Sequence, residues 1–137
     1  MVKKLKLEDQ NSVDFRGLGI VSPEKDYRLC YLLNNELGFD FDKSVNIAFY
    51  DPAKNQRKAV SCYIHNDTDA GDVLYLVKNK QEGFFMVPDM REVDFIFLEP
   101  LNQDDSLNTI KNRISKLDIV QSCFVIPGPK LKHIDAE

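Results

Sequence analysis

The feature that most constrains this fold is a run of strand-like segments between residues 45 and 99. The segments are rich in β-branched and aromatic residues, as strands usually are, and turn-forming residues separate them. They are VNIAFY (45–50), KAVSCYIH (58–65), DVLYLV (72–77), FFMV (84–87) and VDFIFLE (93–99). We therefore predict a meander of antiparallel strands, in which residues 84–87 return as a hairpin from residues 72–77.

A helix is predicted before the meander, over residues 24–37. Its apolar side chains recur at helical spacing. They form a stripe of Leu29, Cys30, Leu33 and Leu37, widened by Tyr27 and Tyr31. Ser22 can cap the free amides at the helix start, and Pro23 suits the first helical position. Gly38 is expected to end the helix, because glycine readily adopts the left-handed backbone found at helix ends.

A second helix and a last strand follow the meander. The helix is predicted over residues 104–117, with Asp104 or Asp105 as its cap. Its apolar stripe consists of Leu107, Ile110, Ile114 and Leu117. The strand is expected at residues 119–126, and the resulting strand–helix–strand order resembles the second half of a ferredoxin-like or ACT-like unit. The predicted fold class is α+β, with a mostly antiparallel sheet and two helices on one face.

The two ends of the chain show weaker patterns. Residues 3–7, KKLKL, alternate like a short first strand. A further strand segment runs to Val21 through Gly17 and Gly19, where a bend or bulge is expected. Residues 127–137 carry mixed charge and are expected to be a solvated tail. The 137 residues are thus predicted to form a single domain with short flexible ends.

Charge and cysteine content exclude several functions. Nucleic-acid binding draws most of its affinity from lysine and arginine, so a net charge of -4 argues against such a partner. No apolar run is long enough to span a membrane, and the amino terminus lacks the apolar region of a signal peptide. Cys30, Cys62 and Cys123 show no zinc-binding or disulfide spacing, so we expect reduced thiols in a cytoplasmic protein.

No catalytic residue, metal site or cofactor is predicted. His65 stands beside a turn and His133 lies in the tail, and both are expected to be exposed. Residues 66–72, NDTDAGD, are rich in oxygen ligands but lack the spacing and the distal glutamate of a calcium-binding EF-hand. We expect them to form a solvated turn.

One acidic residue, Asp94, lies among apolar residues in the stretch VPDMREVDFIF (87–97). Val93, Phe95 and Phe97 are expected to share one strand face, with Asp94 on the other. If both faces are covered, Asp94 must find donors, because an unpaired buried carboxylate is costly. The candidate donors are the side chains of Arg16 and Arg28 and the amides of a neighbouring loop. We expect Asp94 to be a buried structural anchor rather than a catalytic group.

The same stretch resembles the signature of the IPExxxVDY family. The six fixed positions of that signature correspond here to Val87, Pro88, Asp89, Val93, Asp94 and Phe95. Positions 88, 93 and 94 match outright, whereas valine, aspartate and phenylalanine replace the isoleucine, glutamate and tyrosine of the family. The upstream segment LGIVSPEKDYRLCYLLN (18–34) is also similar. The family consists of small bacterial proteins, chiefly from Bacteroidetes, and the resemblance implies no established activity or ligand.

Two functions stay open. The first is a non-enzymatic cytoplasmic module that binds a protein partner or a second copy of itself through an exposed sheet edge. The second is a small-molecule-binding regulatory domain of ACT-like character, whose ligand is unknown. Its pocket residues would be Tyr27, Arg28, Tyr31 and Asp94. An enzyme is not favoured, because the sequence offers no convergent catalytic residues.

Overall fold

The computed structural model describes residues 15–51, 56–67, 72–81, 83–100, 106–132 and 134–135. The predicted first strand at residues 3–7, the predicted caps Asp104 and Asp105, and His133 lie outside the described residues. The helical elements are α2 (Asp26–Leu37), α3 (Ser106–Ser115) and the 3₁₀ turn η1 (Gly128–Leu131). The strands are β1 (Phe15–Val21), β2 (Asp42–Asp51), β3 (Gln56–Asp67), β4 (Asp72–Lys78), β5 (Lys80–Gln81), β6 (Phe84–Phe85), β7 (Phe95–Pro100), β8 (Ser122–Ile126) and β9 (Ile134–Asp135).

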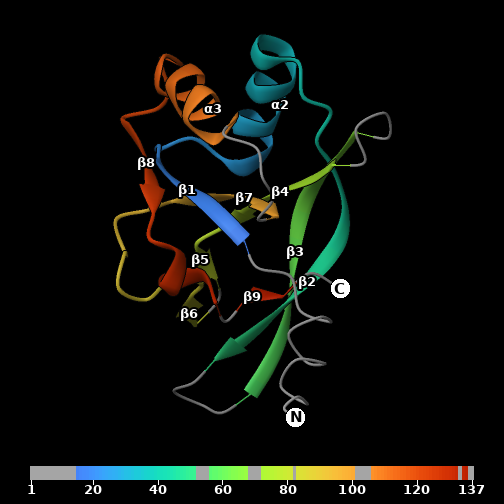
Figure 1. Ribbon diagram of the computed structural model, residues 1–137, viewed down its shortest axis with the longest axis vertical. Coiled ribbons are helices and arrows are strands. Elements are labelled where there is room, and N and C mark those ends of the chain that lie inside the picture. Colours follow the sequence, from blue (N-terminus) through green and yellow to red (C-terminus); the bar gives the residue numbers. More distant parts are fainter. Residues whose placement is uncertain are drawn as a thin grey trace.

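One antiparallel sheet organises the fold, with seven strands in the order β8-β1-β7-β4-β3-β2-β9. Helices α2 and α3 lie side by side over one face of this sheet (Figure 1). The predicted α+β class, with two helices on one face of an antiparallel sheet, is confirmed. Strand β1 runs antiparallel to both of its neighbours, so β7 and β8 are parallel to each other. The unit β7–α3–β8 is therefore a split βαβ unit of the ferredoxin-like kind.

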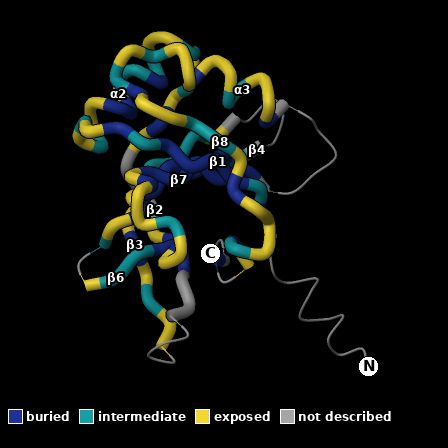
Figure 2. The backbone as a smooth tube through the Cα atoms, turned by 90° about the vertical axis from the view of Figure 1, so that its left-hand side faces the viewer, coloured by how far each residue is buried: buried dark blue, intermediate teal, exposed yellow. Residues whose placement is uncertain are grey.

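Alternate residues of the central strands point to opposite faces of the sheet. In β7, Phe95 and Phe97 join the apolar cluster under the helices, whereas Ile96 and Leu98 join the cluster on the other face. The helices contribute Leu29, Cys30, Leu33, Leu107 and Ile114 to the first cluster. Figure 2 shows the buried stretches of β1 and β7 running beneath the helices. The leucine, isoleucine and cysteine positions of the predicted stripes therefore face the sheet, whereas Tyr27 and Tyr31, which the sequence predicts to widen the first stripe, are exposed.

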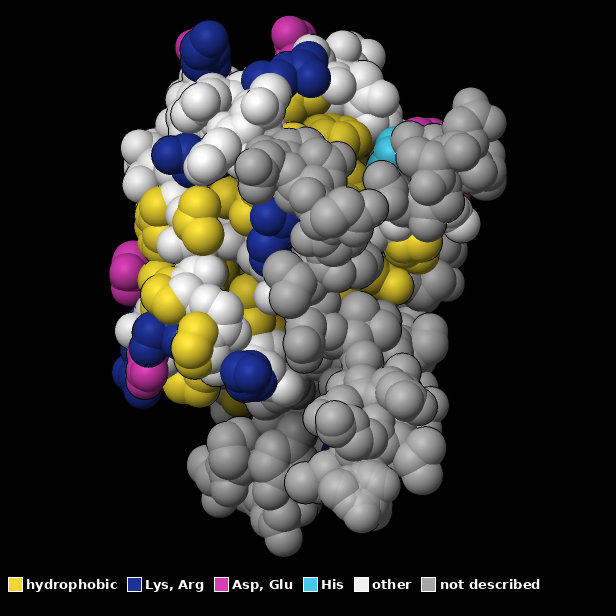
Figure 3. Space-filling view, viewed as in Figure 1, with side chains coloured by type: hydrophobic (Ala, Val, Ile, Leu, Met, Phe, Trp, Pro, Cys, Tyr) yellow, Lys and Arg dark blue, Asp and Glu magenta, His cyan; other side chains and the backbone are white. Residues whose placement is uncertain are grey.

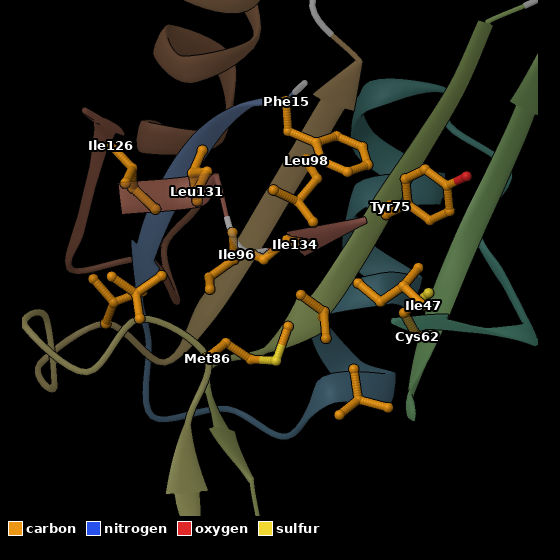
Figure 4. Close-up of a cluster of buried hydrophobic side chains, with 14 residues drawn as sticks. Phe15, Ile47, Cys62, Tyr75, Met86, Ile96, Leu98, Ile126, Leu131 and Ile134 are labelled. Carbon is orange, nitrogen blue, oxygen red and sulfur yellow. The ribbon is translucent and has the colours of Figure 1, made fainter. Parts of the chain in front are cut away.

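Short segments, rather than helices, cover the opposite face. Met86 comes from the loop after β6, and Leu131 and Ile134 come from the C-terminal segment (Figure 4). Leu131 and Ile134 are each 1% exposed, so the predicted solvated tail at residues 127–137 is wrong. Two isolated apolar residues among charged neighbours give no periodic signal in the sequence. They are buried because the apolar face of the sheet needs a cover.

The two glycines of β1 do not interrupt the pairing of the strand. Its register with β7 and with β8 runs without a shift from Gly17 to Ile20, so the structure has no bulge at the predicted place. A Cβ on Gly17 would stand 2.9 Å from Cδ1 of Leu131, and one on Gly19 would stand 3.0 Å from Cγ2 of Val93. The two glycines therefore leave room for the side chains of Leu131 and Val93 to lie close to the backbone of β1.

The predicted hairpin between residues 72–77 and residues 84–87 is also wrong. Strand β4 pairs with β3 and β7, whereas β6 pairs with β5 in a separate two-stranded sheet. The chain leaves the main sheet at Asn79, directly after β4. The small sheet lies on the side away from the helices (Figure 1).

Helix α2 begins later than predicted but ends where expected. Its N-cap is Lys25, which makes no side-chain capping bond. The hydroxyl oxygen of Ser22 instead accepts the amide of Glu24 at 3.3 Å, within the turn that precedes the helix. Gly38 has a φ of 82°, and its amide donates to the carbonyl oxygen of Asn34 at 3.2 Å. Glycine tolerates this left-handed conformation without strain, which explains the stop.

Candidate functional site

The motif residues form a closed loop between β6 and β7. The amide of Met90 donates to the carbonyl oxygen of Val87 at 3.0 Å, and the amide of Val93 donates to that of Met90 at 3.1 Å. The buried motif residues are Val87, Val93 and Phe95, and the exposed ones are Pro88, Asp89 and Asp94. Val93 packs on the face opposite Phe95, contrary to prediction, because β7 begins only at Phe95.

A residue outside the motif, Asn79, holds this loop from the inside. Its side chain is fully buried. The Nδ2 atom donates to the carbonyl oxygens of Met90 and Val93, both at 2.9 Å. The Oδ1 atom accepts the amide of Val87 at 2.8 Å. Sequence reasoning missed Asn79, because an asparagine between two lysines is typical of an exposed turn.

Asp94 ties the start of β7 to the end of β1. Its Oδ2 atom accepts the amide of Ser22 at 2.8 Å, and its own amide donates to the carbonyl oxygen of Ile20 at 2.9 Å. The donor to the carboxylate is thus a loop amide and not Arg16 or Arg28. The expectation that Asp94 is buried is wrong. The residue is exposed because it precedes the first paired residue of β7.

Replacing Asp94 with alanine is expected to lower the free energy of unfolding by about 1–2 kcal/mol, because the buried amide of Ser22 loses its acceptor. Asp94→Asn keeps an oxygen acceptor and should lose less than half as much. Glu92→Ala removes an exposed carboxylate from the same loop and should change stability by at most about 0.5 kcal/mol. Urea unfolding followed by circular dichroism measures all three. An Asp94→Ala variant as stable as the wild type would show that the bond contributes nothing.

Asp89 connects the motif loop to η1. Its carboxylate accepts a hydrogen bond from Nζ of Lys130 at 2.9 Å. This bond and the positive charge of Lys130 hold the pKa of Asp89 below its ordinary value. Any stabilisation of the fold by the Asp89–Lys130 pair is present at pH values above the ordinary pKa of an aspartate and is lost as the pH falls and Asp89 becomes protonated. Since both groups reach solvent, the contribution is small.

The predicted pocket of Tyr27, Arg28, Tyr31 and Asp94 is not assembled. Tyr27 and Tyr31 are 62% and 55% exposed on the outer side of α2, and Arg28 is exposed as well. The phenol oxygen of Tyr31 accepts a hydrogen bond from Nδ2 of Asn35 at 3.1 Å. Asp94 lines a different hollow, next to the connection between β1 and α2.

This hollow beside Asp94 has a volume of about 500 Å³. Its lining consists of Ser22, Pro23, Glu24, Lys25, Asp26, Lys78, Lys80, Asp94 and Phe95. Three lysines and three acidic residues therefore surround one space. A smaller hollow of about 190 Å³ shares Asp26, Lys78 and Phe95 with it and continues to Ser61 and Tyr63. The arrangement can bind charged groups of either sign.

His65 is partly buried, so the prediction of an exposed turn residue is wrong. Its Nδ1 atom accepts the amide of Asp40 at 2.9 Å, and its ring packs edge-on against Phe39 at 5.3 Å between centroids. Through this hydrogen bond and this ring contact, His65 holds the connection between α2 and β2. Residues 68–71 of the candidate calcium turn lie outside the described residues. Among the described residues, no three histidine, cysteine, aspartate or glutamate side chains could jointly hold a metal.

The three cysteines are free, and their thiols are protonated at neutral pH. Burial raises the pKa of Cys30 and Cys62 to about 12 and that of Cys123 to about 11. A nucleophilic cysteine requires the opposite shift, toward the thiolate. None of the three is therefore an activated nucleophile.

Strand β8 forms one edge of the main sheet and is the second candidate site. Within the described chain it pairs only with β1. Val125 is 47% exposed, and Pro127 and Pro129 beyond the strand are exposed too. Figure 3 shows apolar side chains gathered on the side of the molecule where β8 and η1 lie. This edge offers both backbone hydrogen-bonding groups and apolar surface.

No family model, curated protein or solved structure matches this chain. None of the helices in the described ranges has both the length and the apolar character needed to cross a membrane. The hollow and the edge strand are therefore the features from which a function can be inferred.

Proposed function

We propose that this protein is a non-enzymatic protein-interaction module that associates with a second copy of itself through strand β8. One observation carries the proposal: an uncharged strand without proline occupies the edge of the sheet. An edge strand presents a row of backbone donors and acceptors that another strand can pair. The partner class is therefore an extended strand.

Strand β8 itself lacks the sequence features by which proteins prevent an edge strand from pairing with another strand. Such features are charged side chains, proline and very short strands. The five residues of β8 are Ser122, Cys123, Phe124, Val125 and Ile126. The opposite edge differs, because β9 has two residues and the neighbouring β2 carries Asp42, Lys43 and Asp51. Of these two edges, β8 is the better template for pairing.

A second copy fits this edge because identical strands related by a two-fold axis run antiparallel. If the axis passes near Phe124, Ser122 lies opposite the partner subunit's Ile126. Cys123 then lies opposite the partner subunit's Val125. No charged residues oppose each other in this pairing, so no like-charge repulsion arises within it.

Size-exclusion chromatography with light scattering tests the proposal. We expect the wild-type chain to have twice the chain mass at high concentration. Val125→Lys should weaken the dimer on the order of 100-fold, because two like charges would be buried near the two-fold axis. Tyr31→Lys changes a slightly more exposed hydrophobic residue on α2 and should leave the dimer intact. A wild-type protein that stays monomeric, or a Val125→Lys variant that still dimerises, would contradict the proposal.

We place this module in the cytoplasm, because three free thiols suit a reducing compartment.

Membership of the IPExxxVDY family is part of the same proposal. Its support is the motif itself, in which Pro88, Val93 and Asp94 match the family signature.

A further inference from the structure

The charged side chains around the hollow beside Asp94 are not paired with one another. Its three cationic residues are Lys25, Lys78 and Lys80, and its three acidic residues are Glu24, Asp26 and Asp94. Among the described residues, none of the three lysines takes part in an ion pair. The hollow thus presents balanced but separated charges. A ligand that carries both signs could contact both groups at once.

Two of these charged groups, Asp94 and Asp26, are held in position by hydrogen bonds to the protein. Lys78 and Lys80 have exposed side chains, but their backbone is held, because they flank Asn79, which bonds to the motif loop through its side chain and its backbone. Asp94 is oriented by the amide of Ser22. The hydroxyl of Tyr63 is hydrogen-bonded to Asp26, which contributes to raising the pKa of Tyr63 to about 12 after the larger effect of burial. Groups fixed before binding lose little conformational freedom when a ligand arrives.

The balance of charge decides the class of ligand. A phosphate or other dianion would meet three carboxylates, and a metal cation would meet three ammonium groups. A zwitterion can place its carboxylate near Lys78 and Lys80 and its ammonium group between Asp26 and Asp94. The buried ring of Phe95 supplies an apolar wall, and ligand sites commonly combine such a wall with a few polar groups.

The adjoining smaller hollow provides space for a side chain. It shares Asp26, Lys78 and Phe95 with the larger hollow and is also lined by Ser61, Tyr63 and Gln81. From this geometry we infer that the protein binds a free α-amino acid, with the two charged groups in the larger hollow and the side chain in the smaller one. This inference is independent of self-association, since β8 does not line either hollow.

Isothermal titration calorimetry with the twenty free L-amino acids tests the inference. At least one should bind with saturation at millimolar concentration. Its N-acetyl derivative lacks the ammonium charge, and its carboxamide lacks the carboxylate charge. Each derivative should bind at least about tenfold more weakly than the free amino acid. Failure of every amino acid to bind, or equal binding of a capped derivative, would overturn the inference.

Matched variants locate the site. Both lysines at positions 78 and 80 are exposed, so the double variant Lys78→Met, Lys80→Met should fold. It should bind the amino acid at least about tenfold more weakly. Lys116→Met removes an exposed lysine beyond α3 and should bind like the wild type. An undiminished affinity in the double variant, or an equal loss in Lys116→Met, would place the ligand elsewhere and refute the inferred site.

Discussion

Asn79→Ala is expected to lower the free energy of unfolding by about 3–5 kcal/mol, since each buried polar group left unsatisfied costs roughly 1–3 kcal/mol. The substitution removes the acceptor of the Val87 amide and the donors to the carbonyl oxygens of Met90 and Val93. All of these bonds hold the motif loop against the sheet. The melting temperature should fall by on the order of 10 °C. Urea and thermal unfolding measure both quantities.

Two further variants separate hydrogen bonding from packing at this position. Asn79→Asp keeps the size of the side chain but sets a carboxylate oxygen against the carbonyl oxygens of Met90 and Val93. It should destabilise the fold at neutral pH at least as much as alanine does. Gln81→Ala removes a partly exposed amide that donates to the carbonyl oxygen of Lys78 at 2.7 Å and should cost less than about 1 kcal/mol. A loss below about 1 kcal/mol for Asn79→Ala would mean that water replaces the amide.

Leu131→Ala and Ile134→Ala are each expected to destabilise the protein by about 2–4 kcal/mol, as large-to-small substitutions in a core usually do. Both side chains are 1% exposed and cover the sheet face opposite the helices. Truncation of Leu131 would leave a void over Gly17, which has no side chain with which to fill it. Chemical unfolding of the single variants measures the effect.

The control for these two variants is Lys132→Ala, which lies between them in the sequence and is exposed. It should change stability by no more than about 0.5 kcal/mol. If Leu131→Ala and Ile134→Ala behaved like this control, the C-terminal segment would not be part of the core. That result would restore the solvated tail that the sequence predicts.

The sequence pattern correctly predicts which side chains are buried where a helix or strand has one continuous buried face. The alternation in β7 correctly assigns Phe95 and Phe97 to one side and Ile96 and Leu98 to the other. The stripe of α2 likewise faces the sheet, and Gly38 ends that helix. These features depend on residues close together in the chain, so periodicity reports them.

Features that depend on distant contacts were not predictable. Asn79 is buried because the loop at residues 86–94 folds over it, and nothing near it in the sequence signals this. Helix α2 starts later than predicted for a related reason, since the amide of Ser22 bonds to Asp94, which lies far away in the sequence at the start of the neighbouring strand β7. The C-terminal apolar residues needed a partner face that only the assembled sheet provides.

The candidate site was predictable only in part. Asp94 does bond to a loop amide, but its neighbours in the hollow are not the residues of α2 that the sequence favoured. Tyr27 and Tyr31 share a helix face, and that face points to solvent. Helical spacing indicates which side chains lie together but not toward which strand they turn. Lys78 and Lys80 reach the hollow because the chain leaves the sheet between them.

The position of β1 between β7 and β8 has a consequence for biosynthesis. The strand lies near the start of the chain, yet its two neighbours, β7 and β8, come from the last third. A ribosome must therefore synthesise and release the chain as far as β7 before β1 can acquire either partner. Folding of this kind involves mostly long-range contacts and is slow, in the range of milliseconds to seconds. During synthesis the unpaired apolar strand is a natural target for chaperones.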